Sequence, residues 1–245
     1  MGLSDDTPLK RLSKDLQPGM PVGSAWLAQR GISPQLAYRY GKSGWLQPLA
    51  RGVFARPGEQ LDRDKSLRLL VDLGHRVHVG GKTALAWHGY RHNLSLGREK
   101  LTLYRQGSRS LPDWFTRRFP SRVDSRQLFD EPAESGMNVA ESPDHADMPV
   151  SETERAALEM LSEIPAKQGV DEAGSLMESL VSLRSDAMRN LLNGCKSRKT
   201  VLLFFHFARK FDLPVLAFLS PEQWTAGSKS RYVLKLPHGT LALKP

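Results

Sequence analysis

The chain has 245 residues, of which 40% are hydrophobic and 25% are charged, and its formal net charge is +9. These proportions are typical of soluble globular proteins, and no apolar run reaches the roughly twenty residues that a membrane span needs. The N-terminus has neither the apolar core nor the cleavage site of an export signal, and Cys195 is the single cysteine. The sequence therefore predicts a cytoplasmic protein without disulfides, formed by one large domain or two ordinary ones.

Positive charge is concentrated in two segments of the sequence. Residues 8–58 carry eight Lys or Arg and one acid, Asp15, and residues 91–126 carry nine basic side chains and three acids. Residues 127–172 reverse the sign, with twelve acids and two bases. Charge runs are commonly solvated faces, but a basic segment with a local fold of its own favours an anionic partner.

Residues 8–58 predict three short helices. An amphipathic helix over residues 9–16 ends before Pro18, which cannot continue it. Ser24 is expected to cap a second helix over SAWLAQRG, because a serine side chain accepts hydrogen bonds from free amides at a helix start. Ser33 is expected to cap a third helix over PQLAYRYGKSG, with the proline at its first position. Two short helices joined by a tight, glycine-containing turn form a helix-turn-helix.

The third predicted helix is amphipathic and ends at Gly41 or Gly44. Leu36, Ala37 and Tyr40 have helical spacing and are expected to face the core. The residues expected on its exposed face are Gln35, Tyr38, Arg39 and Lys42.

The letters WLQPLARGVFARPGE predict a β-hairpin directly after this helix. Two strands, over residues 45–49 and 53–55, are joined by a turn at Arg51 and Gly52, where glycine can adopt a positive φ. A hairpin in this position is a wing. It places Arg51 at the tip and Arg56 at the exit, where both could reach phosphate or a minor groove.

We expect this unit to bind double-stranded DNA, with the third helix in the major groove. Gln35 can pair with adenine and Arg39 with guanine in bidentate fashion, while Tyr38 can contact the backbone or a thymine methyl group. The alternative is a winged helix used only for protein contacts, and the near absence of acids argues against it. The candidate DNA-binding residues are Ser33, Gln35, Tyr38, Arg39, Lys42, Arg51, Arg56, Lys10 and Lys14.

The remainder of the chain predicts a larger domain of mixed helices and strands. We expect a winged-helix domain over residues 1–60 and an α+β domain over residues 61–245. In chain order, its predicted elements are a helix over DKSLRLLVDLG, a strand over RVHVG, a helix from Thr83, a strand over KLTLYR, and mostly helices after Glu152. The buried run LLFFHF belongs to one of these helices. Strand-like residues return at 231–235, and residues 130–149 predict a long exposed loop.

The sequence GGKT at residues 80–83 resembles part of a phosphate-binding loop. That loop needs a glycine four residues earlier than Gly80, and Arg76 occupies position 76, so a nucleotide site is not expected. Two glycines before a helix start could still bind an anion with help from Lys82. The other basic residues of this domain that could contact DNA or RNA are Arg91, Arg105 and Arg109, with Arg98, Arg117 and Arg118 beside them.

Metal and catalytic sites are not expected. His88 and His92 have metal-ligand spacing, with His75 and His78 nearby in sequence, but no further carboxylate or thiolate is supplied, so structural histidines are the better interpretation. No acid is followed by Lys two residues later, as a nuclease metal site needs, and no nucleophile motif is present. The sequence predicts neither an enzyme nor a bound cofactor.

The stretch GSAWLAQRGISPQLAYRYGKSGWLQPLARGVFARPGE resembles the N-terminal winged helix of the AbiEi family, the antitoxins of type IV toxin–antitoxin systems. The shared features are an ARG-[IL]-S turn, an SGWL segment and an RG-[VY]-[FY]-x-RPG close. The resemblance continues through VHVGGKTALAWHGYRHNLSLG, LPDWF, MPVSETERAALEMLSEIP and LLNGCKSRK, and so covers most of the chain. The tail AGSKSRYVLKLPHGTLALKP departs from the family, with no recognisable final strand motif.

The resemblance implies a repressor that recognises inverted repeats upstream of its own operon. It also implies antitoxin activity in the larger domain against a nucleotidyltransferase-like toxin encoded beside it, without a stable antitoxin–toxin complex. A different class remains open: a stand-alone winged-helix regulator whose second domain senses a ligand or mediates oligomerisation. The identity of the neighbouring gene discriminates between the two.

Overall fold

The computed structural model describes residues 7–91, 100–130, 136–139, 148–225, 232–236 and 239–243. These residues form two compact units. The first comprises residues 7–76, 108–120 and 148, and the second comprises the other described residues. Mixed helices and sheets confirm the predicted α+β class. The domain boundary expected between residues 60 and 61 stays a prediction.

The first unit contains a winged helix with a three-stranded antiparallel sheet in the order β1-β3-β2. Val53 of β3 pairs with Gly23 of β1, and Ala55 pairs with Gln47 of β2. The elements of this unit are α1 (Pro8–Asp15), β1 (Val22–Gly23), α2 (Ser24–Ala28), α3 (Pro34–Lys42), β2 (Gln47–Ala50), β3 (Val53–Ala55), α4 (Arg63–Asp72) and α6 (Asp113–Thr116).

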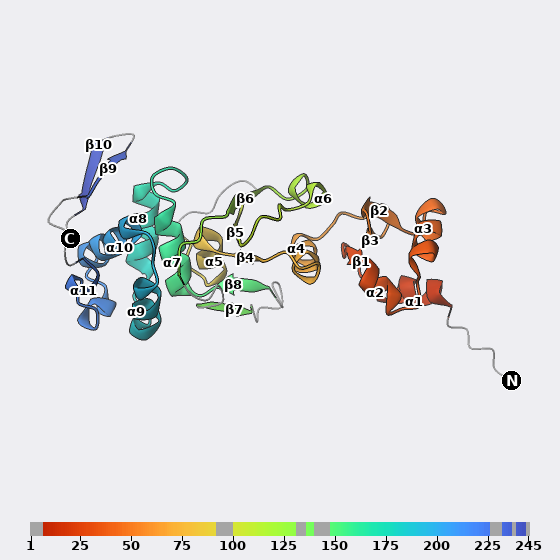
Figure 1. The fold of residues 1–245 in the computed structure, drawn as a ribbon, viewed down its shortest axis with the longest axis horizontal. Helices are drawn as coiled ribbons and strands as arrows, with labels where there is room; N and C mark the ends of the chain where they lie inside the picture. The colour runs from red at the N-terminus through yellow and green to blue at the C-terminus, as the bar shows by residue number, and fades with distance from the viewer. Residues whose placement is uncertain are drawn as a thin grey trace. The chain divides into compact units, whose positions relative to one another are not determined.

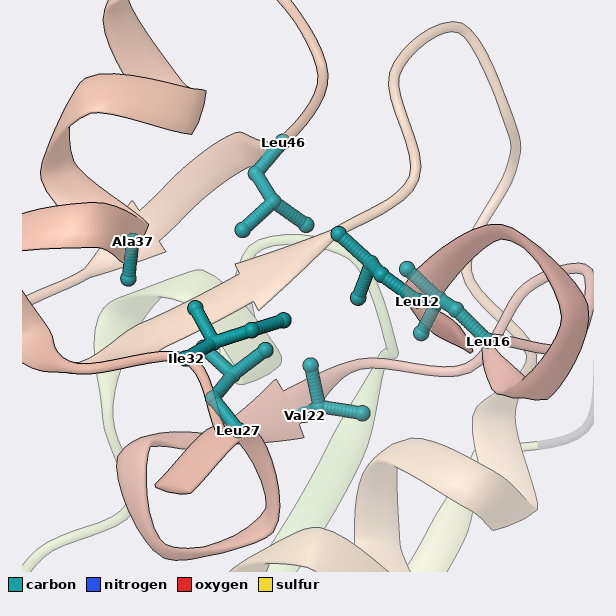
Figure 2. Close-up of a cluster of buried hydrophobic side chains, with 7 residues drawn as sticks. All are labelled: Leu12, Leu16, Val22, Leu27, Ile32, Ala37 and Leu46. Carbon is teal, nitrogen blue, oxygen red and sulfur yellow. The ribbon is translucent and has the colours of Figure 1, made fainter. Parts of the chain in front are cut away.

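A small aliphatic cluster holds the winged helix together (Figure 2). Its members come from α1 and the residue that follows it, from α2 and α3, from β1 and from the turns on either side of α3, and they point toward one another. Each fully buried aliphatic side chain contributes about 1.5–3 kcal/mol relative to exposure. The cluster consists of Leu12, Leu16, Val22, Leu27, Ile32, Ala37 and Leu46.

The two predicted serine caps have different outcomes. Ser33 caps α3 as predicted, because its side chain accepts the amide of Leu36 at 3.2 Å. The prediction for Ser24 is wrong: Gly23 is the N-cap residue of α2, and Ser24 is the first helical residue. The α2 helix starts directly after β1, so the Ser24 amide and hydroxyl instead donate to the carbonyl of Gly52, at 2.9 and 3.2 Å.

The second unit is built on a mixed five-stranded sheet in the order β6-β5-β4-β8-β7. The pairs β4–β8 and β5–β6 are parallel, and β4–β5 and β7–β8 are antiparallel. The strands are β4 (Val77–Val79), β5 (Leu101–Arg105), β6 (Ser121–Asp124), β7 (Met137–Val139) and β8 (Pro149–Ser151).

One helix, α7, organises the packing of this unit (Figure 1). It contacts α5 and β8 on the sheet side and α8, α9 and α10 on the other, so it is buried along most of its length. The aromatic run predicted as core lies in α10, where its apolar side chains are buried. The helices are α5 (Gly81–Trp87), α7 (Thr153–Ser162), α8 (Val170–Ser179), α9 (Ser185–Asn193), α10 (Arg198–Lys210), the 3-10 helix η1 (Pro214–Ala217) and α11 (Glu222–Thr225).

Three predictions for this part of the chain need correction. The helix expected from Thr83 begins at Gly81. The loop expected over residues 130–149 contains strand β7, which pairs with β8, and its residues 131–135 and 140–147 lie outside the described part. The strand expected at residues 231–235 is present as β9 (Tyr232–Leu236), but the tail, in which no final strand motif was recognised, adds β10 (Gly239–Leu243), which pairs with β9 in an antiparallel hairpin. None of the helices in the described part of the chain has both the length and the apolar composition that a membrane span requires.

Candidate nucleic-acid interface

The outer face of α3 carries the four polar side chains that the sequence assigned to it. Gln35, Tyr38, Arg39 and Lys42 are all exposed, Tyr38 at 63%. Residues four apart on a helix are neighbours, so Gln35 lies beside Arg39 and Tyr38 beside Lys42. The Lys42 ammonium lies 5.6 Å from the centre of the Tyr38 ring. This face therefore combines hydrogen-bonding groups for base edges with positive charge.

The opposite face of α3 fixes these side chains in place. Ala37 is buried in the core, and Leu36 and Tyr40 pack against it, as predicted. The helix runs through Gly41, and its end is set by Gly44, which has a φ of +79°. Because one face is packed and both ends are fixed, the polar face is presented on a rigid element.

The wing is anchored at its turn. Gly52 has a φ of +74°, and a Cβ at this position would lie 2.8 Å from the Ser24 hydroxyl oxygen, so the turn needs glycine. The Gly52 carbonyl accepts both hydrogen bonds from Ser24. Arg51, the preceding residue, is exposed at the wing tip. The wing thus holds a basic side chain in position beside α2.

Arg56 lies where the sequence placed it but is engaged within the fold. Its guanidinium donates to the carbonyls of Ser13, at 3.0 Å, and Leu16, and it pairs with Glu59 at 3.3 Å. These bonds satisfy carbonyls at the C-terminal end of α1. The side chain therefore ties the wing exit to α1.

The remaining charged residues of the winged helix also favour binding of an anion. Lys10 and Lys14 are exposed on α1. Asp15, the one acid in residues 8–58, is paired with Arg30 at 2.9 Å. The Arg30 guanidinium also lies 3.6 Å from the centre of the Trp26 ring. Asp15 is thus neutralised locally and adds little repulsion toward phosphates.

In the second unit, the N-terminus of α5 already holds an anion from the chain itself. The Gly81 amide donates to the carboxylate of Glu159 at 3.0 Å. Lys82, expected to assist a bound anion, pairs instead with Glu172. A Cβ on Gly80 would lie 2.2 Å from a Glu159 oxygen, so this glycine makes room for the carboxylate. The GG letters therefore serve the fold.

Glu159 is the centre of a buried hydrogen-bond network. Its carboxylate accepts from Arg155 Nε at 2.9 Å and from Ser151 Oγ at 2.8 Å, and it lies 2.9 Å from His78 Nε2. Burial alone would raise the pKa of Glu159. The charge and hydrogen bond of His78, together with Arg155 and Ser151, outweigh burial and lower this pKa below its usual value. The network joins β4, β8 and α5 to α7.

Most of the other basic residues expected to contact nucleic acid bind groups of the chain itself. Arg109 donates to the carbonyl of Leu73 at 2.8 Å, Arg117 pairs with Asp113, and Arg118 donates to the carbonyl of Trp114. Arg91 donates to the carbonyl of Ala86 at 3.4 Å, and the Nη1 atom of Arg105 is buried with no partner among the described residues. Arg98 lies outside the described residues. Arg91, Arg109, Arg117 and Arg118 are thus each bound to a nearby group of the chain itself.

The histidines are also used within the fold. His88 Nε2 donates to the carbonyl of Ser151 at 2.8 Å, His78 bonds to Glu159, and His75 is buried. His92 lies outside the described residues. Within the described ranges, no three His, Cys, Asp or Glu side chains are grouped as metal ligands.

Two sequence profiles together match nearly the full chain. Residues 5–96 match the profile described as the N-terminal domain of the AbiEi antitoxin, a transcriptional regulator. Residues 98–242 match the profile described as the AbiEi antitoxin, a transcriptional regulator of a type IV toxin–antitoxin system. The chain belongs to the AbiEi antitoxin family. The resemblance drawn from the sequence is therefore confirmed.

A solved structure has the same fold as this AbiEi-family chain. The crystal structure of the RV2827C protein from Mycobacterium tuberculosis superposes with a TM-score of 0.62 at 20% identity, covering 91% of this chain and 86% of that chain. At this identity the likeness concerns the fold alone. A search among curated proteins found no match.

The motif residues that this chain shares with the AbiEi family form hydrogen bonds and a helix cap in the second unit. The GG letters and the S, R and last E of VSETERAALE (Ser151, Arg155 and Glu159) belong to the Glu159 network. In LLNGCKSRK, Ser197 caps α10, and Lys199 donates to the carbonyls of Ser162 and Ile164 at the end of α7. The sequence contains these motifs but does not show that their residues bind one another. The spacing of Ser151, Arg155 and Glu159 places them close together, but Gly81, which also binds Glu159, lies 78 residues away in the chain.

Proposed function

We propose that the chain binds operator DNA through α3 and the wing and represses its own operon. The observation that carries this proposal is the exposed face of α3, with Gln35, Tyr38, Arg39 and Lys42, in a segment (residues 8–58) whose one acid is paired with Arg30. Family membership as a transcriptional regulator supports the same function. Neutral or basic partners would not favour so basic a face, whereas the phosphates of DNA complement it.

The proposed docking places the N-terminal part of α3 in the major groove. Gln35 contacts adenine and Arg39 contacts guanine, each by paired hydrogen bonds. Ser33 and Tyr38 contact the flanking backbone or a thymine methyl group. Arg51 reaches phosphate or the minor groove from the wing tip. Lys10, Lys14 and Lys42 lie along phosphates, and Arg56 supports the wing from behind.

Operator recognition by this class of motif follows from its geometry. One α3 helix reads one half-site, so two copies of the chain on an inverted repeat read both halves, one or more helical turns apart. We therefore propose inverted repeats upstream of the operon as the target, in double-stranded DNA.

We further propose that the chain counters a nucleotidyltransferase-like toxin encoded beside it, with the second unit supplying this activity and no stable complex required. Membership of a type IV antitoxin family supports this. No residue of the second unit is assigned a catalytic role.

The experiment separates the two activities in the full-length chain. A reporter carries the DNA upstream of this gene, and the adjacent gene is expressed with wild-type chain or with the double variant Gln35→Ala, Arg39→Ala. We expect the variant to lose repression and keep protection of growth, because α3 is not part of the second unit. Unchanged repression would contradict DNA binding through α3. An adjacent gene that is harmless without the chain would contradict the antitoxin role and favour a stand-alone regulator.

A further inference from the structure

Two large aromatic side chains are exposed on the first unit, and both lie at or beside α3. Tyr38 is 63% exposed and Trp45 is 55% exposed; the other large exposed apolar side chains among the described residues belong to the second unit. Tyr38 is already part of the proposed recognition face. Trp45 has no role in that proposal, although an indole carries more apolar surface than most side chains. Trp45 therefore offers an exposed apolar ring that a partner can cover.

The turn that ends α3 holds Trp45 outward. The amides of Trp45 and Leu46 both donate to the carbonyl of Tyr40, at 2.9 and 3.1 Å. Leu46 is 1% exposed and joins the core cluster (Figure 2), which leaves the neighbouring indole outside it. The backbone on both sides is therefore fixed, and Trp45 is presented between α3 and the first strand of the wing.

The charged residues near Trp45 in the sequence indicate which class of partner covers it. Residues 31–58 contain four basic side chains and no acid. A second copy of the chain would bring these like charges together, which opposes self-association through this face. A polyanion matches both the charges and the indole, because an indole has an apolar body and an N–H donor at its edge. Three of the four, Arg39, Lys42 and Arg51, are exposed, and the fourth, Arg56, is paired with Glu59.

We propose that Trp45 is a DNA-contacting residue of this chain. Its ring packs on the sugar–phosphate backbone beside the groove that α3 enters, and its Nε1–H donates to a phosphate oxygen. Most protein–DNA hydrogen bonds go to phosphate and sugar, and such contacts fix register without reading sequence. This inference rests on the proposed DNA binding and adds an apolar contact between α3 and the wing.

Tryptophan fluorescence of the full-length chain tests the contact. The other tryptophans are buried or half-buried, so Trp45 is the most accessible to the neutral quencher acrylamide. The probes are duplexes tiled over the DNA upstream of this gene and shuffled duplexes of equal length. We expect bound duplex to protect the wild-type chain from quenching, and Trp45→Phe to remove this protection.

Binding measurements complete the test. Trp45→Ala is expected to weaken binding about tenfold or more, because it loses both the apolar contact of the ring and the Nε1–H hydrogen bond. Trp45→Phe keeps the ring contact and loses the donor, so we expect about a fivefold loss. Phe218→Ala is the matched control: it removes a 64% exposed aromatic from the second unit and should leave binding unchanged.

Three outcomes would overturn the inference. If wild type binds the upstream duplex but quenching is unchanged, or if Trp45→Ala binds as well as wild type, Trp45 is not at the interface and the proposed function survives. A lower molar mass of free Trp45→Ala in sedimentation would assign Trp45 to a protein interface. A wild-type chain that binds no duplex would overturn the proposed function and this inference together.

Discussion

Arg39 and Arg51 carry the same charge on different elements of the winged helix. Both are exposed, and the proposed docking gives Arg39, on α3, a contact with base edges and Arg51, at the wing tip, a contact with the backbone. We expect Arg39→Ala to cost about 1–3 kcal/mol on the operator duplex and less on a shuffled duplex. Arg51→Ala should weaken binding to both duplexes similarly, as measured by fluorescence anisotropy. Equal losses on both duplexes for Arg39→Ala would mean that this side chain contacts only phosphate.

Glu159 is a single buried carboxylate on which much of the stability of the second unit is expected to depend. Removing its charge leaves Arg155 and His78 without their shared acceptor charge. We expect Glu159→Gln to lower the free energy of unfolding by about 3–5 kcal/mol, because it breaks a buried ion pair on one side. Chemical denaturation measures the loss, with the exposed Glu178→Gln as the control that should be close to neutral.

The pH dependence of stability follows from the lowered pKa of Glu159. A carboxyl group whose pKa is lower in the folded state contributes stability that is complete above the unfolded-state pKa. That contribution is lost as the pH falls through the lowered, folded-state pKa. We therefore expect wild type to lose more stability than Glu159→Gln when denaturation is repeated from neutral to acidic pH. Parallel pH curves for the two proteins would show that the network does not depend on the ionised carboxylate.

The wing and α2 act as one structural element because Ser24 binds the carbonyl of Gly52. A methyl group at Gly52 combines a φ of +74° with a Cβ 2.8 Å from the Ser24 hydroxyl oxygen. Gly58 has a φ of +75° with nothing within 4 Å of its Cβ, so Gly58→Ala carries the backbone strain alone. We expect Gly52→Ala to destabilise the chain more than Gly58→Ala in thermal unfolding, and to weaken DNA binding. Equal effects of the two substitutions would mean that the contact with Ser24 is unimportant.

The local elements of the winged helix could be predicted because their signals are close in sequence. Ser33 and Pro34 start α3 within two residues, and the turn at Gly52 lies between two short strands. The cap predicted for Ser24 failed because a long-range bond to Gly52 competes for its side chain. Strands β7 and β10 were missed for a similar reason, since their pairing partners and not their own letters define them.

The candidate site was predictable to the extent that it follows from helical spacing. One face of α3 is packed, so the opposite face had to be exposed. The tie between Arg56 and the carbonyls of α1 joins residues about forty positions apart, and no periodicity in the sequence encodes it. The Glu159 network is longer in range still. Sequence spacing therefore located the exposed polar side chains better than the buried ones.

The two compact units of the chain differ in how their charged side chains are used. In the winged helix, the exposed basic groups of α3 and the wing tip are presented outward, whereas buried carboxylates such as Glu159 and Asp124 in the second unit are neutralised by the cations around them. Burial would raise the pKa of Asp124, but hydrogen bonds from Arg126 and Lys167 hold it well below its usual range. We infer that DNA affinity comes mainly from the first unit.

Binding of the full-length chain to the upstream duplex, titrated by anisotropy over a range of salt concentrations beside a shuffled duplex, tests this division most directly. We expect the upstream duplex to bind about a thousandfold tighter or more. The logarithm of the affinity should fall linearly with the logarithm of salt, with a slope of about −0.9 per neutralised phosphate. Equal affinity for the two duplexes, or an affinity that salt does not change, would contradict specific DNA recognition by the winged helix.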